Sequence, residues 1–173
     1  MDKVLRDREA THDEDRVNDE SVALRFCWHT IGEVGLDAEG KLAFPRAPAG
    51  PGVYRLEVDG PEPSVYVGEA NDLRRRFSHY RNPGPSQWAN QRLRSLLTPV
   101  MADGGRCRLS VAAEIAFGVR SQLAELDLRL KAARLLVESS AIVLARHDGR
   151  RTVLNLDAAF DRELGGRSRR SDA

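Results

Sequence analysis

The chain has 173 residues, of which 41% are hydrophobic and 31% are charged, with a formal net charge of +1. This balance is typical of a globular domain with one sizeable core and excludes a disordered or membrane-embedded chain. The apolar runs are too short for a spanning helix or a signal peptide, so we expect no membrane association and a cytoplasmic location. Cys27 and Cys107 predict neither a disulfide framework nor a zinc site, and both are expected to be structural thiols.

Two segments precede the expected compact domain. Residues 1–20 carry eight acidic and four basic residues without hydrophobic periodicity, which predicts a disordered acidic leader. Residues 21–49 predict an N-terminal extension, in which 22–31 and 36–44 are candidates for extra strands. Prolines and glycines then indicate a linker that ends near residue 50.

The compact domain is expected to span residues 50–157 and to open with a hairpin. Residues 53–58 and 64–68 flank a turn of glycine and prolines that forbids strand continuation. A turn centred near Gly60 places Tyr54 and Tyr66 roughly opposite each other on one face of the sheet. Two phenols would then meet over one patch of the sheet.

Two helices and a strand are expected after this hairpin. Asn71 is expected to cap a helix from Asp72 to about Tyr80, followed by a helix over 88–100 and a strand over 107–115. One face of the first helix gathers apolar side chains and a single arginine, while the neighbouring arginines point elsewhere. The residues on that face are Leu73, Arg76, Phe77 and Tyr80.

A long helix over 122–147 and a short strand over 152–156 complete the predicted domain. Glu138 lies on or near the apolar stripe of that helix rather than on its wet face. Asn155 belongs to the short strand. Residues 158–173 predict a mobile, Arg-rich tail.

The segments Gly52-Val53-Tyr54 and Tyr66-Val67-Gly68, with Arg76 ten residues after the second tyrosine, resemble the signature of the GIY-YIG nuclease family. The resemblance covers about 50–157 and is greatest for the N-terminal nuclease module of the bacterial nucleotide-excision-repair incision subunit, which also has a tyrosine at the position of Tyr80. Glu69 departs from that module, which tends to carry a lysine there.

The resemblance implies an α+β fold, a small, mostly antiparallel central sheet flanked by helices. It implies a metal-dependent DNA endonuclease of the restriction or repair type. Its implied metal is Mg2+, replaceable by Mn2+ and held by Glu138. The implied catalytic residues are Tyr54, Tyr66, Arg76, Tyr80, Glu138 and Asn155.

These residue types suit phosphodiester hydrolysis. The reaction needs an activated water and neutralisation of the charge that builds on the phosphate. A carboxylate is a hard ligand for Mg2+, and a guanidinium both binds a phosphate and favours a nearby phenolate. The choice between Tyr54 and Tyr66 as the base stays open. Each of these residues alone is more often structural, and their combination favours the nuclease.

DNA is the expected partner because residues 66–108 hold eight arginines against three acidic residues. Specificity would come from residues 20–50, from surface loops or from a specificity partner, and double-strand cleavage would imply a homodimer or sequential nicking. The alternatives are a non-cleaving nucleic-acid-binding module on the same scaffold and a protein-interaction subunit. The candidate phosphate contacts are Arg74, Arg75, Arg81, Arg92 and Arg94.

Overall fold

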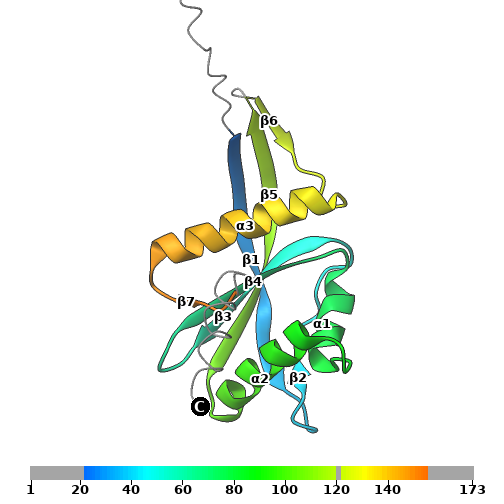
Figure 1. Ribbon diagram of the computed structural model, residues 1–173, viewed down its shortest axis with the longest axis vertical. Helices are drawn as coiled ribbons and strands as arrows, with labels where there is room; N and C mark the ends of the chain where they lie inside the picture. Colours follow the sequence, from blue (N-terminus) through cyan, green and yellow to red (C-terminus); the bar gives the residue numbers. More distant parts are fainter. Residues whose placement is uncertain (1–21, 120–121, 156–173) are drawn as a thin grey trace, which may run out of the picture.

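The structure is a computed structural model that describes residues 22–119 and 122–155 (Figure 1). Within these residues, seven strands form one mostly antiparallel sheet with three helices packed against it, which confirms the expected α+β fold. The expected leader at 1–20 and tail at 158–173 lie outside the described residues. None of the described helices is long and apolar enough to cross a bilayer.

The strand order across the sheet is β2-β1-β5-β3-β4-β7, with β6 paired to β5. Every pair is antiparallel except the short parallel pair of β4 with β7. The strands are β1 (Val22–Leu36), β2 (Leu42–Ala43), β3 (Gly52–Asp59), β4 (Ser64–Ala70), β5 (Arg106–Val119), β6 (Gln122–Glu125) and β7 (Thr152–Val153).

The N-terminal extension is part of this sheet. The two strands expected there are one long strand, β1, and the short β2. Between them the Asp37 carboxylate accepts backbone N–H bonds from Glu39 and Lys41, both at 2.9 Å, and closes the turn. Because β1 lies between β2 and β5, the sheet includes strands from both sides of residue 50 in the sequence.

The hairpin of β3 and β4 forms as expected, but its register differs by two residues. Tyr54 lies opposite Gly68, and Tyr66 lies opposite Leu56. The two tyrosines therefore share a face, as expected, but are diagonal neighbours rather than opposite residues. The turn is centred on Pro61 instead of Gly60, and a shift of one residue at the centre moves every cross-strand partner by two.

The helices are α1 (Leu73–Arg81), α2 (Trp88–Ala102) and α3 (Lys131–Asp148). Asp72, not Asn71, caps α1, because its carboxylate accepts the N–H of Arg75 at 3.0 Å. The expected helix over 122–147 is wrong in its first part. Residues 122–125 form β6, since hydrogen bonding to β5 outweighs their helix propensity.

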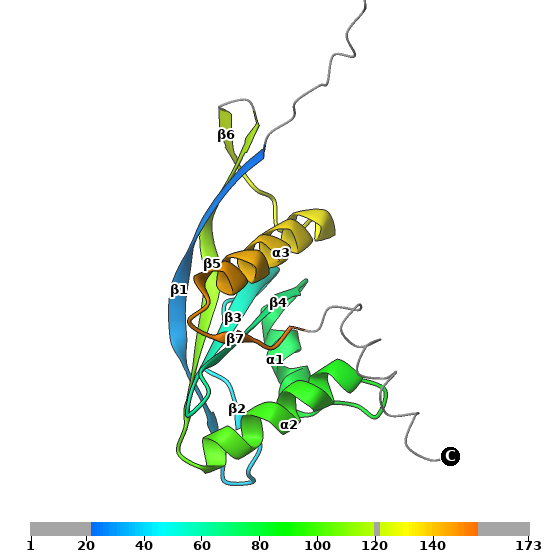
Figure 2. The same ribbon diagram turned by 60° about the vertical axis from the view of Figure 1, so that its left-hand side comes forward.

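Alternate residues of β3 and β4 contribute to two hydrophobic cores on opposite faces of the sheet. Tyr54, Leu56 and Val58 pack against α1 and α2, whereas Val53, Val65 and Val67 pack against α3. Successive side chains of a strand point to opposite faces, so β3 and β4 separate α3 from the α1 and α2 pair, as Figure 2 shows.

Cys107 is fully buried at the α1 and α2 face, and this burial raises the pKa of its thiol to about 12. The thiolate is the reactive form, so we expect Cys107 to resist alkylation in the folded chain and to react on unfolding. The partly exposed Cys27 is the internal control, and mass spectrometry after partial alkylation distinguishes the two. Equal labelling of both cysteines in the folded protein would contradict the expectation.

Candidate active site

Three tyrosines from three elements meet on the α1 face of the sheet. Tyr54 comes from β3, Tyr66 from β4 and Tyr80 from the last turn of α1. Their ring centroids lie 6.2 to 6.5 Å apart. The hydroxyls of Tyr54 and Tyr80 are hydrogen-bonded to each other, and the Tyr80 hydroxyl donates to Tyr66 Oη at 3.4 Å. We call these three residues the tyrosine cluster.

Arg76 adjoins the cluster from α1. Its Nε donates to Tyr54 Oη at 3.2 Å, and its guanidinium carbon lies 5.2 Å from the centre of the Tyr80 ring. Its Nη1 donates to Asn90 Oδ1 at 3.4 Å. Burial alone would lower the pKa of Arg76, but the phenols of Tyr54 and Tyr80 raise it overall. The guanidinium therefore keeps its charge at this half-buried position.

The helix wheel of α1 explains this placement. Leu73, Phe77 and Tyr80 are buried, Arg76 is half-buried beside them, and Arg74 and Arg75 are exposed. The sequence-based expectation that a single arginine of the three faces the core side is thus confirmed. Spacings of three and four residues place these side chains on one helix face.

The three phenols differ in their burial. Tyr54 is fully buried and Tyr80 is 1% exposed, whereas Tyr66 is half-buried. Burial, and then the neighbouring phenols, raise the pKa of both Tyr54 and Tyr80 above that of a free tyrosine, although Arg76 opposes the shift. Tyr54 and Tyr80 consequently keep their protons, and Tyr66 is the cluster member within reach of solvent.

Gly68 makes room for the tyrosine cluster. It lies directly opposite Tyr54 across the hairpin, and a Cβ at this position would stand 2.5 Å from Tyr54 Cζ. The ring of Tyr54 therefore lies over the bare backbone of β4. A side chain at residue 68 would displace the hydroxyl that Arg76 binds.

We expect Gly68→Ala to lower the free energy of unfolding by about 1–3 kcal/mol, because a rigid ring must move in a packed core. Gly35→Ala is the matched control, since Gly35 also lies in a strand and a Cβ there would meet nothing within 4 Å. Urea unfolding of both variants measures the difference. A Gly68→Ala variant as stable as Gly35→Ala would contradict the close packing of Tyr54 on β4.

Glu138 projects from α3 near the end of β4. Burial, and then the carboxylate of Glu69, raise its pKa, while the Glu69 backbone N–H and Arg76 partly oppose the shift. Glu69 forms an ion pair with the buried Arg134, whose Nε lies 2.5 Å from Glu69 Oε2. Arg134 thus pairs with Glu69 and places a second carboxylate beside Glu138.

A hollow of about 160 Å³ adjoins these groups. Arg75, Arg76 and His79 line it from α1, Asp72 lines it from the cap of α1, and Glu69 lines it from β4. Two guanidinium groups and two carboxylates thus border a small polar opening beside Arg76. The two guanidinium groups are donors of the kind that bind a phosphate group of a nucleic acid.

Asn155 hydrogen-bonds to the backbone of β4 and holds this strand in place. Its Oδ1 accepts from Val67 N at 2.9 Å, and its Nδ2 donates to Val67 O at 2.6 Å. The side-chain amide of Asn155 thus forms with Val67 the hydrogen bonds that the backbone of a neighbouring strand would form. In this geometry Asn155 is a positioning residue for the cluster.

The candidate phosphate contacts separate into two groups. Arg74 Nε donates to the Ala47 carbonyl at 3.0 Å, and Arg81 forms an ion pair with Asp37, so both also fix loops of the fold. Arg75 and Arg92 are exposed, and Arg94 is half-buried. Arg75 is the one of these that borders the hollow.

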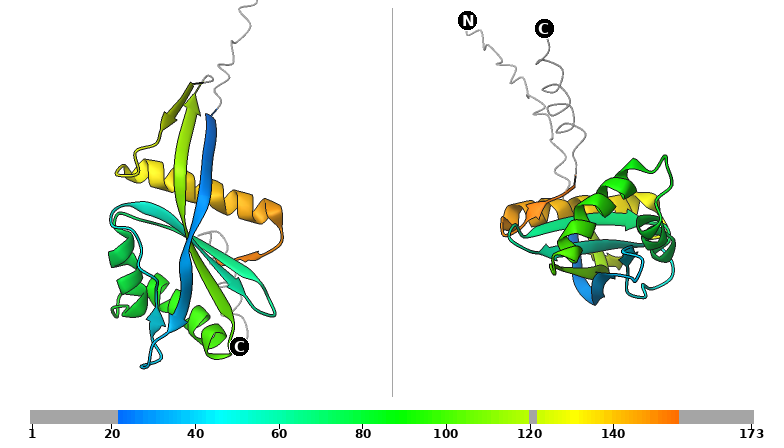
Figure 3. Two further views of the ribbon diagram at one scale, coloured as in Figure 1. Left: turned by 180° about the vertical axis from the view of Figure 1, so that it is seen from behind. Right: turned by 90° about the horizontal axis from the view of Figure 1, so that it is seen from below.

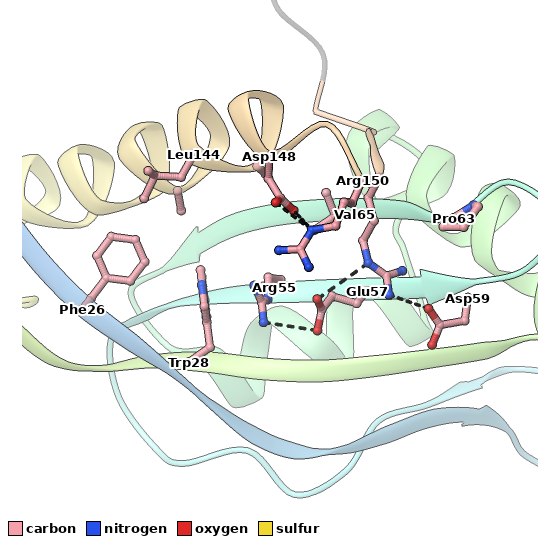
Figure 4. A pocket seen from close by; sticks show the side chains of 13 residues that line it. Phe26, Trp28, Arg55, Glu57, Asp59, Pro63, Val65, Leu144, Asp148 and Arg150 are labelled. Carbon is pink, nitrogen blue, oxygen red and sulfur yellow. Dashed lines mark hydrogen bonds and ion pairs between the residues drawn. The ribbon is translucent and has the colours of Figure 1, made fainter.

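A larger pocket, of about 580 Å³, lies on the α3 face of the sheet (Figure 4). Phe26, Trp28 and Leu144 supply apolar surface to it. Its charges are balanced, because three arginines are matched by three carboxylates: Arg55, Arg150 and Arg151 against Glu57, Asp59 and Asp148. The residues that line this pocket include none of the three tyrosines, Arg76 or Glu138, so the candidate site remains at the tyrosine cluster.

Sequence reasoning missed Asn90, His79 and the role of Arg134. Asn90 is 5% exposed and shares a face of α2 with Leu93 and Leu97, so a polar residue at an apolar helix position was the available signal. His79 lines the hollow. No spacing in the sequence indicates that Arg134 contacts Glu69, because the two residues are 65 positions apart.

No protein-family model and no curated protein matches the chain. Three chains of solved structures match it. One is a mutant of EndoII from bacteriophage T4, with a TM-score of 0.36 and 19% identity. The match covers 50% of the present chain and 64% of the EndoII chain. Likeness at this level assigns no family, so the functional argument rests on the residues of the site.

Proposed function

We propose that the chain is a metal-dependent DNA endonuclease of the GIY-YIG type, in which Tyr66 is the general base. The observation that carries this proposal is the convergence of three phenols, of which Tyr66 is half-buried while Tyr54 and Tyr80 are buried. Arg76 donates to Tyr54, and Tyr80 donates to Tyr66. The hydroxyls of Tyr54 and Tyr80 are also hydrogen-bonded to each other.

Tyr66 differs from its two neighbours in its access to solvent. Tyr54 and Tyr80 are buried, whereas Tyr66 is half-buried. Tyr66 is therefore the phenol that an attacking water can reach, and it takes the proton of that water as the general base. Arg76 supplies positive charge beside the cluster.

Arg76 and Arg75 bind the phosphate at the hollow beside α1. The Arg76 guanidinium is fixed by Tyr54 and Asn90, so it need not reorganise when charge builds on the phosphate. The remaining exposed arginines of α1 and α2 supply phosphate contacts that confer affinity without sequence choice. DNA is the substrate that we propose.

Glu138 would hold Mg2+ or Mn2+, with Glu69 next to it. The fit rests on the half-buried Glu138 carboxylate. Burial and Glu69 raise its pKa, and a bound cation would offset both effects because it stabilises the charged carboxylate. One or two carboxylates are the usual protein share of a Mg2+ shell. A bound Mg2+ stabilises the charge that develops on the leaving oxygen.

Cleavage of supercoiled plasmid by the full chain, with Mg2+ or with EDTA, tests the proposal. We expect metal-dependent nicking or linearisation, and DNA affinity that falls with salt. Salt-dependent binding without cleavage would favour the non-cleaving nucleic-acid-binding module. Absence of both would favour a protein-interaction subunit.

A further inference from the structure

Three side chains of metal-binding types meet on β1 and β5, outside the tyrosine cluster but on the same face of the sheet, since His29 and Tyr54 both pair with Val111. Cys27 and His29 come from β1, and Glu114 comes from β5. Their Sγ, ring nitrogen and carboxylate oxygen atoms all lie within 4.8 Å of one another, and His29 Nε2 is 3.6 Å from Glu114 Oε1. Two ligands of one tetrahedral zinc lie about 3.3–3.8 Å apart, given the usual bond lengths.

An irregularity in the pairing of β1 with β5 places Glu114 next to Cys27 and His29. Arg25 pairs with Ala116 and Cys27 pairs with Ala113, so β5 has one more residue than β1 between these pairs. Glu114 occupies this bulge with a φ of 51°, in the left-handed region that residues other than glycine rarely adopt. In a regular ladder, residue 114 would face the side opposite to Cys27. The bulge turns its carboxylate toward Cys27 and His29.

The site is open to solvent. Trp28 lines the pocket on the α3 side, so its neighbours Cys27 and His29 face the other way. Seen from behind, β1 runs in front of α3 and is not covered there by any described helix (Figure 3, left). The side chains of His29 and Glu114 are 56% and 76% exposed. A metal ion can therefore reach all three ligands without any opening of the fold.

We propose that Cys27, His29 and Glu114 bind Zn2+ and thereby fix the bulge between β1 and β5. A thiolate with an imidazole and a carboxylate suits Zn2+ and disfavours Mg2+, which prefers oxygen ligands. Three protein ligands leave the fourth position to a water molecule. The sequence signal was Cys27-Trp28-His29, because residues two apart on a strand share a face.

Titration of the metal-stripped full chain with Cd2+ tests the thiolate ligand, because cadmium–thiolate bonds absorb in the ultraviolet. We expect one Cd2+ to bind per chain, Zn2+ to displace it, and Zn2+ to raise the Tm. Cys27→Ser should abolish the absorption. Cys27→Ser, His29→Ala and Glu114→Gln should each weaken Zn2+ binding about tenfold or more. His147→Ala, at an exposed histidine of α3, is the control.

Glu114→Gly separates the loss of a ligand from a failure to fold. Glycine accepts the positive φ of residue 114 without strain, so this variant should fold and still bind Zn2+ weakly. The proposal is overturned if Cys27→Ser keeps the absorption, or if His29→Ala and Glu114→Gly bind Zn2+ as tightly as the parent chain.

Discussion

Glu138→Gln is expected to reduce Mg2+-dependent cleavage of plasmid DNA to the background level while DNA binding persists. The variant keeps the shape of the side chain but removes the carboxylate charge that we propose holds the metal. Binding persists because the arginines of α1 and α2 are unchanged. Glu125→Gln, at an exposed position of β6, is the matched control and should cleave like the parent chain.

The same substitution should stabilise the metal-free protein. The pKa of Glu138 is raised by burial and by Glu69. A carboxyl whose pKa is higher in the folded state lowers stability as the pH rises through that pKa. Glu138→Gln should therefore have the higher Tm at neutral pH, and this difference should vanish at a pH below the ordinary range for glutamate. Thermal unfolding with EDTA measures both points.

Loss of cleavage together with a lower Tm at neutral pH would indicate a folding defect and contradict this account. A Glu138→Gln variant that cleaves with Mg2+ at the parent rate would exclude Glu138 as the metal ligand. Glu69→Gln then becomes the next substitution to measure, since Glu69 is the carboxylate next to it.

Tyr66→Phe is expected to lower the rate of cleavage about 10²–10⁴-fold, the usual contribution of a general base. The Tm should change little, because Tyr66 is half-buried and loses only the long hydrogen bond from Tyr80, at 3.4 Å. Single-turnover cleavage with saturating protein measures the chemical step separately from DNA binding.

Tyr54→Phe is the comparison that tests the assigned roles. Its hydroxyl is fully buried and hydrogen-bonds to both Arg76 and Tyr80, so its removal leaves the Arg76 Nε–H without its acceptor and Tyr80 with one hydrogen bond fewer. We expect a loss of about 1–3 kcal/mol in the free energy of unfolding. The effect on cleavage should be smaller than that of Tyr66→Phe. A larger loss of cleavage in a stable Tyr54→Phe variant would reverse the roles of these two tyrosines.

The local pattern of the chain predicted much of the α1 face of the site. Two strands separated by glycine and prolines predicted the hairpin, and helical spacing placed Arg76 and Tyr80 on one face of α1. Both signals act over a few residues, so no knowledge of distant contacts is needed. The same reasoning failed for residues 122–125, where pairing with β5 outweighed helix propensity.

The sequence by itself thus determined the shared face of Tyr54 and Tyr66 and the inward Arg76, because these follow from strand and helix periodicity. Its resemblance to a known family predicted the α+β class. Only the tertiary structure decided the register that places Gly68 under Tyr54, the burial that leaves Tyr66 as the phenol within reach of solvent, and the pairing of Glu69 with Arg134. It also decided the meeting of Glu114 with Cys27 and His29. These contacts join residues far apart in the chain, and they depend on the position of a turn and of a bulge, which no local periodicity specifies.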